Sequence, residues 1–200
     1  MVATKKMQNK ITAAAKDVLL APVYLYQGHK IKRDTVRLPE PNGERHGQVQ
    51  LNNSPITSKG KSNNILNLMV VGDSAAAGVG SQTQQEALVG HLIPILTEQA
   101  AIQSAFDTLN WSLQATTGYT SFDILRRLYV LPAPSQPIDV MVLSVGVNDT
   151  TSKVSAAQWQ QQIENIIAIA QRKFGVRELV FLSLPPMAQM PAIPVPLNNF

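Results

Sequence analysis

The sequence has no cysteine, few histidines and no long apolar run, and each shortage excludes a class of protein. Without cysteine the chain cannot form disulfides, thiolate metal sites or a thiol nucleophile. The three histidines are scattered at positions 29, 46 and 91, a spacing that matches no metal-ligand pattern. No segment approaches the roughly 20 apolar residues of a membrane span. Disulfide-linked, metal-binding and membrane-spanning proteins are therefore disfavoured.

Charge is divided unevenly along the 200 residues. Residues 1–62 hold eleven lysines and arginines against four acidic residues, whereas residues 63–200 hold six against nine. A basic front can attract an anionic membrane or nucleic acid, or it can be a solvated segment without a partner. Because no nucleic-acid-binding motif is present, nucleic acid is not an expected partner. Peripheral membrane contact through the front of the chain stays open.

The first 62 residues read as a helix followed by a linker. Apolar residues recur at helical spacing over Gln8–Leu20, and residues 27–64 are polar, basic and rich in proline and glycine. Such a helix could lie on a membrane surface or dock on the protein itself. The early lysines resemble a signal peptide, but Lys16-Asp17 interrupts its apolar stretch, which favours an unprocessed, cytoplasmic protein. We predict a basic N-terminal helix and irregular linker over 1–62 and one globular domain over 63–200.

Within this domain, apolar strand patterns alternate with helical ones. Strands are predicted at Ile65–Gly72, Asp107–Gln114, Ile138–Val145 and Glu178–Leu184, and helices at 84–99, 121–130 and 155–174. The first strand has no sustained polar alternation, which is typical of a parallel strand covered on both faces. The alternating order predicts an α/β fold, in which helices cover both faces of a parallel sheet as a three-layer α/β/α sandwich.

Three successive predicted strands are each followed by a residue that can take part in catalysis. Ser74 follows the first strand, Gly118 the second and Asn148 the third. Because the carboxyl ends of parallel strands meet at one edge of the sheet, we expect these residues to converge. A hydroxyl nucleophile, a backbone N–H and a side-chain amide are what acyl transfer requires, since the N–H groups can stabilise the oxyanion of a tetrahedral intermediate.

These segments resemble a known family. Gly72-Asp73-Ser74, Gly118 and Gly146-Val147-Asn148-Asp149 are similar to the first three sequence blocks of the SGNH hydrolases, also called GDSL esterases/lipases, over about residues 63–190. The resemblance implies a flavodoxin-like sheet and makes Ser74 the nucleophile. It implies an oxyanion hole formed by the backbone N–H groups of Ser74 and Gly118 and the side chain of Asn148. The implied activity is hydrolysis of lipid or acylated sugar and small-alcohol esters through an acyl-enzyme, without metal or cofactor.

The resemblance fails at the family's fourth block, Asp-x-x-His, which supplies the general base. No histidine follows His91, which is 17 residues after Ser74. If most of that interval is helical, His91 lies on the order of 20 Å from Ser74. His29 and His46 fall in the expected linker. We therefore predict a hydrolase domain that is incomplete at its C-terminal end, with impaired activity in this chain. The alternatives are a non-catalytic protein that binds an acyl chain or a carboxylate, and a membrane-surface pseudo-hydrolase.

Two acidic residues beside the motifs have structural interpretations. Asp73 is predicted to hydrogen-bond the turn that carries Ser74, and Asp149 is predicted to be the N-cap of the helix that follows it. Neither is assigned a catalytic role.

Overall fold

The four predicted strands form a parallel sheet, and a fifth strand from earlier in the chain joins it. The computed structural model describes residues 22–23, 26, 30, 38–51 and 64–184. The described elements follow one another along the chain as β1 (His46–Gln50), β2 (Ile65–Gly72), α2 (Ser74–Ala77), the 3-10 helix η1 (Gln84–Glu86), α3 (Leu88–Thr97), α4 (Ala100–Ala105), β3 (Thr108–Ala115), α5 (Ser121–Val130), β4 (Val140–Ser144), α6 (Val147–Thr151), α7 (Ala156–Phe174) and β5 (Glu178–Phe181).

The strand order is β1-β3-β2-β4-β5, in which β2, β3, β4 and β5 are parallel and β1 is antiparallel to β3. The four parallel strands have the flavodoxin-like order, since the first of them is flanked by the second and the third. The chain moves from β2 to β3 on one side and returns past β2 to reach β4. Right-handed crossovers therefore place the helices of the two connections on opposite faces of the sheet.

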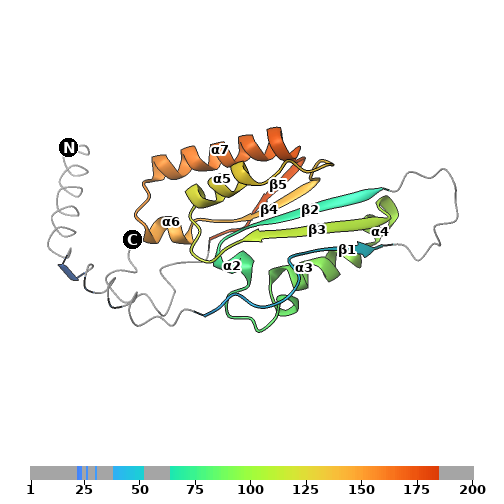
Figure 1. Ribbon diagram of the computed structural model, residues 1–200, viewed down its shortest axis with the longest axis horizontal. Helices are drawn as coiled ribbons and strands as arrows, with labels where there is room; N and C mark the ends of the chain where they lie inside the picture. Colours follow the sequence, from blue (N-terminus) through green and yellow to red (C-terminus); the bar gives the residue numbers. More distant parts are fainter. Residues whose placement is uncertain (1–21, 24–25, 27–29, 31–37, 52–63, 185–200) are drawn as a thin grey trace, which may run out of the picture. The chain divides into compact units, whose positions relative to one another are not determined.

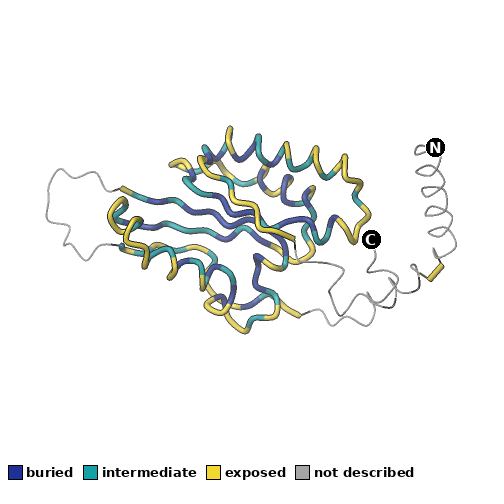
Figure 2. Tube along the Cα trace, turned by 180° about the vertical axis from the view of Figure 1, so that it is seen from behind, coloured by how far each residue is buried: buried dark blue, intermediate teal, exposed yellow. Residues whose placement is uncertain are grey.

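Two apolar cores confirm the predicted three layers. Side chains of β2 alternate between them: Met69 and Val71 pack with α5 and α7, whereas Leu68 and Val70 pack with α2 and α3. Figure 1 shows α5 and α7 on one face of the sheet and α2 and α3 on the other. In Figure 2 the central strands are buried along most of their length. The apolar run of β2 follows from this double burial, because a polar side chain on either face would be desolvated.

The predicted helices are confirmed in part. The capping box of Ser155 with Gln158 begins α7, and Gly175 ends it in the left-handed conformation. The single helix expected over 84–99 is instead η1 followed by α3, and α4 continues after it. None of the described helices is long and apolar enough to span a membrane.

The segment expected to be an irregular linker differs most from the prediction. Its residues His46–Gln50 form strand β1, which pairs with Thr108–Ser112 of β3. This strand adds an antiparallel edge to the sheet. The predicted N-terminal helix and the predicted C-terminal incompleteness concern residues outside those described, and both stay predictions.

Candidate active site

Ser74 stands at the turn between β2 and α2, as predicted. Asp73 is the N-cap of α2, and its carboxylate accepts hydrogen bonds from the backbone N–H of Ala75 (3.1 Å) and the hydroxyl of Ser144 (3.3 Å). The predicted structural role of Asp73 is thereby confirmed. Burial raises the pKa of Asp73, and the nearby Asp149 adds to this rise, whereas the two hydrogen bonds oppose it. Ser74 is the first residue of α2 and is partly exposed.

The turn requires glycine at position 72 because two neighbours approach its Cα closely. A Cβ there would lie 2.7 Å from the Cβ of Ala76 and 2.7 Å from the carbonyl oxygen of Ser144. These distances are shorter than van der Waals contact, so a side chain would push α2 or β4 away. Gly72 thus lets the strand, the helix and the neighbouring strand meet where Ser74 is presented.

Gly118 lies in a tight turn that follows β3. The N–H of Tyr119 donates to the carbonyl of Thr116 (3.2 Å), and Gly118 has φ +86° while Thr117 has a negative φ. Of the two central residues of this turn, only the second has a positive φ, which is the pattern of a type II turn. This conformation favours glycine at that position. In the described part of the chain the N–H of Gly118 donates to no acceptor, and a Cβ at this residue would have no neighbour within 4 Å. Its N–H is therefore available to a ligand.

Asn148 connects the end of β4 to this turn. It lies in α6, which begins directly after Gly146 (φ +130°), and its side-chain amide donates to the carbonyl of Tyr119 (2.9 Å). An amide nitrogen carries two hydrogens. The bond to Tyr119 fixes the orientation of the amide and leaves the second hydrogen for another acceptor.

The register of the sheet brings the three predicted residues to one edge. Gly72 pairs with Ala115 on one side and with Ser144 on the other. Ser74, Gly118 and Asn148 follow these three paired residues by two, three and four positions. Figure 1 shows α2 and α6 at the same end of the sheet. This edge lies at the switch point of the strand order, where open α/β sheets bind their ligands.

Asp149 does not have its predicted role. It lies inside α6, whose N-cap is Gly146, and it is only 2% exposed. Its carboxylate accepts the backbone N–H of Ser121 at 3.1 and 3.0 Å and also the hydroxyl of Ser121. Ser121 is the first residue of α5. The carboxylate therefore caps the N-terminus of a different helix, α5, and joins it to α6.

Neither described histidine, His46 or His91, forms a hydrogen bond with Ser74. His46 is opposite Ser112 on β3, which is opposite Met69 on β2. Two strand spacings separate His46 from Met69 by about 10 Å across the sheet. The five residues from Met69 to Ser74 add about 16 Å along the strand direction. His91 is exposed on α3, and η1 interrupts the helix that was expected to separate it from Ser74. His29 lies outside the described residues.

Sequence reasoning missed Glu40 and Arg45, which lie beside the turn that holds Gly118. The carboxylate of Glu40 accepts hydrogen bonds from the backbone N–H (2.6 Å) and the hydroxyl (2.8 Å) of Thr117. The guanidinium of Arg45 forms an ion pair with Glu40 (2.9 Å) and donates to the carbonyl of Ala115. Burial raises the pKa of Glu40, but the hydrogen bonds from Thr117 and the charge of Arg45 outweigh it and lower this pKa overall. Nothing local in the sequence marks these contacts, because they join residues 70 and 77 positions apart.

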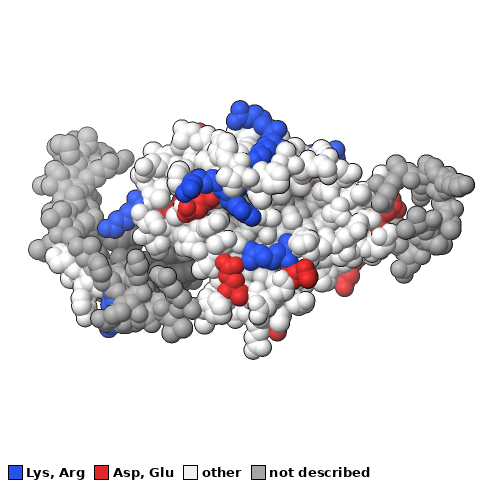
Figure 3. All heavy atoms as spheres, viewed as in Figure 1, with Lys and Arg blue, Asp and Glu red and all other residues white. Residues whose placement is uncertain are grey.

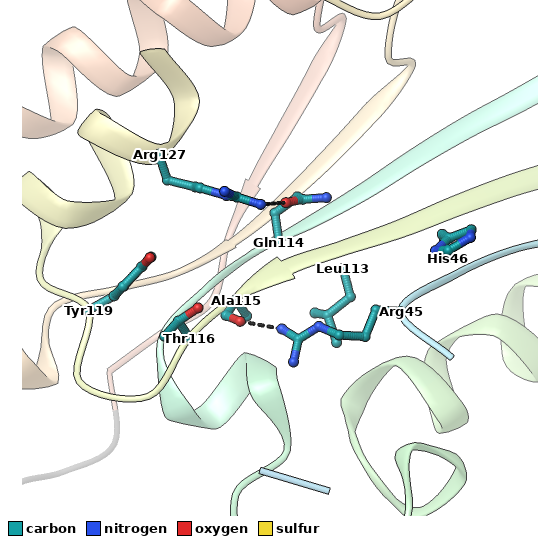
Figure 4. A pocket seen from close by; sticks show the side chains of 8 residues that line it. All are labelled: Arg45, His46, Leu113, Gln114, Ala115, Thr116, Tyr119 and Arg127. Carbon is teal, nitrogen blue, oxygen red and sulfur yellow. Dashed lines mark hydrogen bonds between the residues drawn. The ribbon is translucent and has the colours of Figure 1, made fainter. Parts of the chain in front are cut away.

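A shallow cavity of about 250 Å³ lies beside the same turn. It is lined by Arg45, His46, Leu113, Gln114, Ala115, Thr116, Tyr119 and Arg127. Figure 4 shows Arg45 reaching Ala115 on one side of β3, while Arg127 contacts Gln114 on the other side.

The described surface carries both signs of charge. Figure 3 shows acidic and basic side chains interspersed over the described part of one face. Of the eleven basic residues in 1–62, only Lys30 and Arg45 are among the described residues. The predicted membrane contact through this basic segment therefore stays a prediction.

Comparison with known proteins gives one family match and several similar structures. The model of the GDSL-like lipase/acylhydrolase family matches residues 70–199. The structure of TesA is similar with TM-score 0.50 and 28% identity, covering 63% of this chain and 66% of TesA. AlinE4, an SGNH-hydrolase family esterase, gives TM-score 0.46 and 21% identity, covering 64% of each chain. Axe2, an acetylxylan esterase from Geobacillus stearothermophilus, gives 0.47 and 14%, covering 66% of this chain and 65% of Axe2. This chain spans less than two thirds of each of these structures, and no curated protein matches it.

Proposed function

The chain belongs to the GDSL-like lipase/acylhydrolase family, and on this premise we propose that it cleaves carboxylic esters through an acyl-enzyme on Ser74. The observation that carries the proposal is the meeting of three strand ends at one edge of the sheet. Support comes from the register, because the partly exposed Ser74, Gly118 with its free N–H and Asn148 with its oriented amide follow three paired residues of neighbouring strands. The substrate class is an ester of a lipid or of an acylated sugar or small alcohol.

The proposed reaction begins when the hydroxyl oxygen of Ser74 attacks the ester carbonyl. The developing oxyanion receives hydrogen bonds from the backbone N–H groups of Ser74 and Gly118 and from the amide of Asn148, which stabilise the tetrahedral intermediate. The C–O bond to the alcohol then breaks, the alcohol leaves with a proton, and the acyl group stays on Ser74. Water attacks this ester in the second step and releases the carboxylic acid.

Proton removal from Ser74 is the weak step of this mechanism. A serine hydroxyl is a poor nucleophile without an adjacent base, and neither His46 nor His91 forms a hydrogen bond with Ser74. The lower activity that follows should be restored in part by a base added in solution. Imidazole is suited to this because its pKa lies near neutral pH and it is small enough to enter an open site.

Chemical rescue tests the proposal. We expect slow hydrolysis of p-nitrophenyl butyrate that increases with imidazole concentration, after subtraction of the reaction of imidazole alone. Ser74→Ala should abolish the protein-dependent part, whereas Ser104→Ala, on exposed α4, should leave it unchanged. A fluorophosphonate should label the parent chain and not Ser74→Ala. If Ser74→Ala hydrolyses the ester as fast as the parent chain with and without imidazole, the proposal is wrong.

The distance between His46 and Ser74 favours one other function, which is binding without catalysis. The same free N–H groups could hold the carboxylate of a fatty acid. This reading is supported if butyrate or a longer fatty acid binds, if Asn148→Ala weakens that binding, and if imidazole produces no turnover that depends on Ser74.

A further inference from the structure

The turn after β3 carries the candidate oxyanion donor, and its inner side is held by the sheet. The N–H of Thr116 donates to the carbonyl of Gly72 at the end of β2 (3.1 Å). The carbonyl of Tyr119 accepts the amide of Asn148. These bonds attach the two ends of the turn to β2 and to α6. The two residues between them, Thr117 and Gly118, have no hydrogen bond to either element.

The outer side of the turn lies beyond the reach of β1. Strand β1 pairs with β3 as far as Ser112, and the carbonyl of Arg45 still accepts the N–H of Leu113 (2.7 Å). Further along β3, none of the described strands lies beside the main-chain groups on that side. Side chains take its place: the guanidinium of Arg45 donates to the carbonyl of Ala115 and the carboxylate of Glu40 accepts the N–H of Thr117. Figure 4 shows the first of these bonds.

The segment Glu40–Arg45, called the strap below, is itself attached to the domain. The N–H of Gln84 donates to the carbonyl of Asn42 (2.9 Å), and the buried side chain of Gln84 donates to the carbonyls of Pro41 (3.5 Å) and Ala77 (3.0 Å). Since Ala77 is the last residue of α2, the strap is attached to the same helix that begins with Ser74. The strap therefore connects the turn that holds Gly118 to the helix that begins with the nucleophile.

We propose that Glu40 and Arg45 are positioning residues, which hold Thr117 so that the N–H of Gly118 is placed to stabilise the oxyanion. This inference rests on the proposed function. A Cβ at Gly118 would meet nothing within 4 Å, so the turn has open space on the side to which a side chain would point. Thr117, the residue before Gly118, is restrained by the two short, charge-assisted hydrogen bonds that it donates to the carboxylate of Glu40. Because oxyanion donors act on the transition state, their displacement lowers kcat more than it raises KM.

The test compares variants of the full chain with p-nitrophenyl butyrate in the presence of imidazole. Loss of an entire oxyanion donor lowers kcat about 10²–10³-fold, so the misplacement expected in Glu40→Ala should lower kcat about tenfold, with KM changed less than about twofold. Glu40→Gln retains an oxygen that can accept from Thr117 and should recover most of the loss, to within about threefold of the parent. The matched control is Glu44→Gln, which removes the same charge from an exposed neighbour and should leave both constants unchanged.

A purely structural strap would give a different pattern, in which kcat is retained below the melting temperature. If kcat of Glu40→Ala is within about twofold of the parent while Ser74→Ala is inactive, the positioning role is wrong and the proposed function stands. If Ser74→Ala is as active as the parent, the proposed function itself fails. Should Glu40→Ala not fold, Thr117→Val decides: it removes only an exposed hydroxyl that donates to Glu40. A kcat reduced about threefold at constant KM supports the proposal, and an unchanged kcat overturns it.

Discussion

The buried carboxylate of Asp149 offers the sharpest test of how the candidate site is held together. In Asp149→Ala the backbone N–H of Ser121 loses its acceptor at a site where Ser121 is 0% exposed. The N-cap of α5, Thr120, is kept in this variant, so the cost is that of an unsatisfied buried donor, about 1–3 kcal/mol. The Ser121 hydroxyl also loses a partner, although it still contacts Gln162. We therefore expect a decrease of about 3 kcal/mol in the free energy of unfolding.

The assay is thermal unfolding followed by circular dichroism at neutral pH. For domains of this size 1 kcal/mol corresponds to about 2–4 °C, so Asp149→Ala should melt about 6–12 °C below the parent. Asp149→Asn keeps one oxygen for the N–H of Ser121 but loses the charge, and it should fall between the two. The control is Glu164→Ala. Its carboxylate is exposed on α7 and, within the described part of the chain, accepts a hydrogen bond only from Gln160 (2.9 Å), an interaction worth about 0.2–0.5 kcal/mol. If Asp149→Ala melts within about 2 °C of the parent, the capping role is wrong.

Four further outcomes are expected. Gly72→Ala should lower the free energy of unfolding in urea by about 1–3 kcal/mol, because its Cβ would lie 2.7 Å from Ser144 and from Ala76; an unchanged midpoint would show that the close contact relaxes freely. Asp73 has a raised pKa in the folded protein, so the stability that its protonated form contributes is present below the pKa of the unfolded chain and is lost as pH rises through the folded value. Asp73→Asn should therefore gain stability relative to the parent as pH rises. A stability difference between the two proteins that does not change with pH would contradict this. Glu40 has a lowered pKa, so the stability it contributes should be lost as pH falls through the folded value, and Glu40→Gln should flatten the acid side of the pH-stability curve. Phe181 is 43% exposed on β5, which pairs only with β4 among the described strands, so Phe181→Lys should reduce aggregation measured by light scattering; equal aggregation of both chains would show that this edge is not responsible.

Much of the candidate site could be predicted because its signals are local. The apolar run of β2 and the glycine that ends it are contained in eight consecutive residues. The same holds for the capping box of α7, which Ser155 and Gln158 form across one turn of helix. Since parallel strands end at a common edge, the positions of Ser74, Gly118 and Asn148 in the chain were enough to predict that they lie at one edge.

Strand β1 could not be predicted in this way. Its sequence, His-Gly-Gln-Val-Gln, alternates between exposed and partly buried residues and contains a single large apolar side chain. Only Val49 of this strand packs against an apolar core, and glycine is depleted in strands. Its hydrogen bonds come from the open edge of β3, which exists only after the sheet has formed.

The sequence by itself determined the α/β class, the three strand ends and the family, because periodicity and turn chemistry act between residues that are near in the chain. Only the tertiary structure decided the roles of Asp149 and Glu40. Asp149 lies within a helix yet caps another that begins 28 residues earlier, and Glu40 holds a turn 77 residues away. A carboxylate takes its partner from whichever donors the fold brings within about 3 Å, and neither residue type nor spacing records which donors those are.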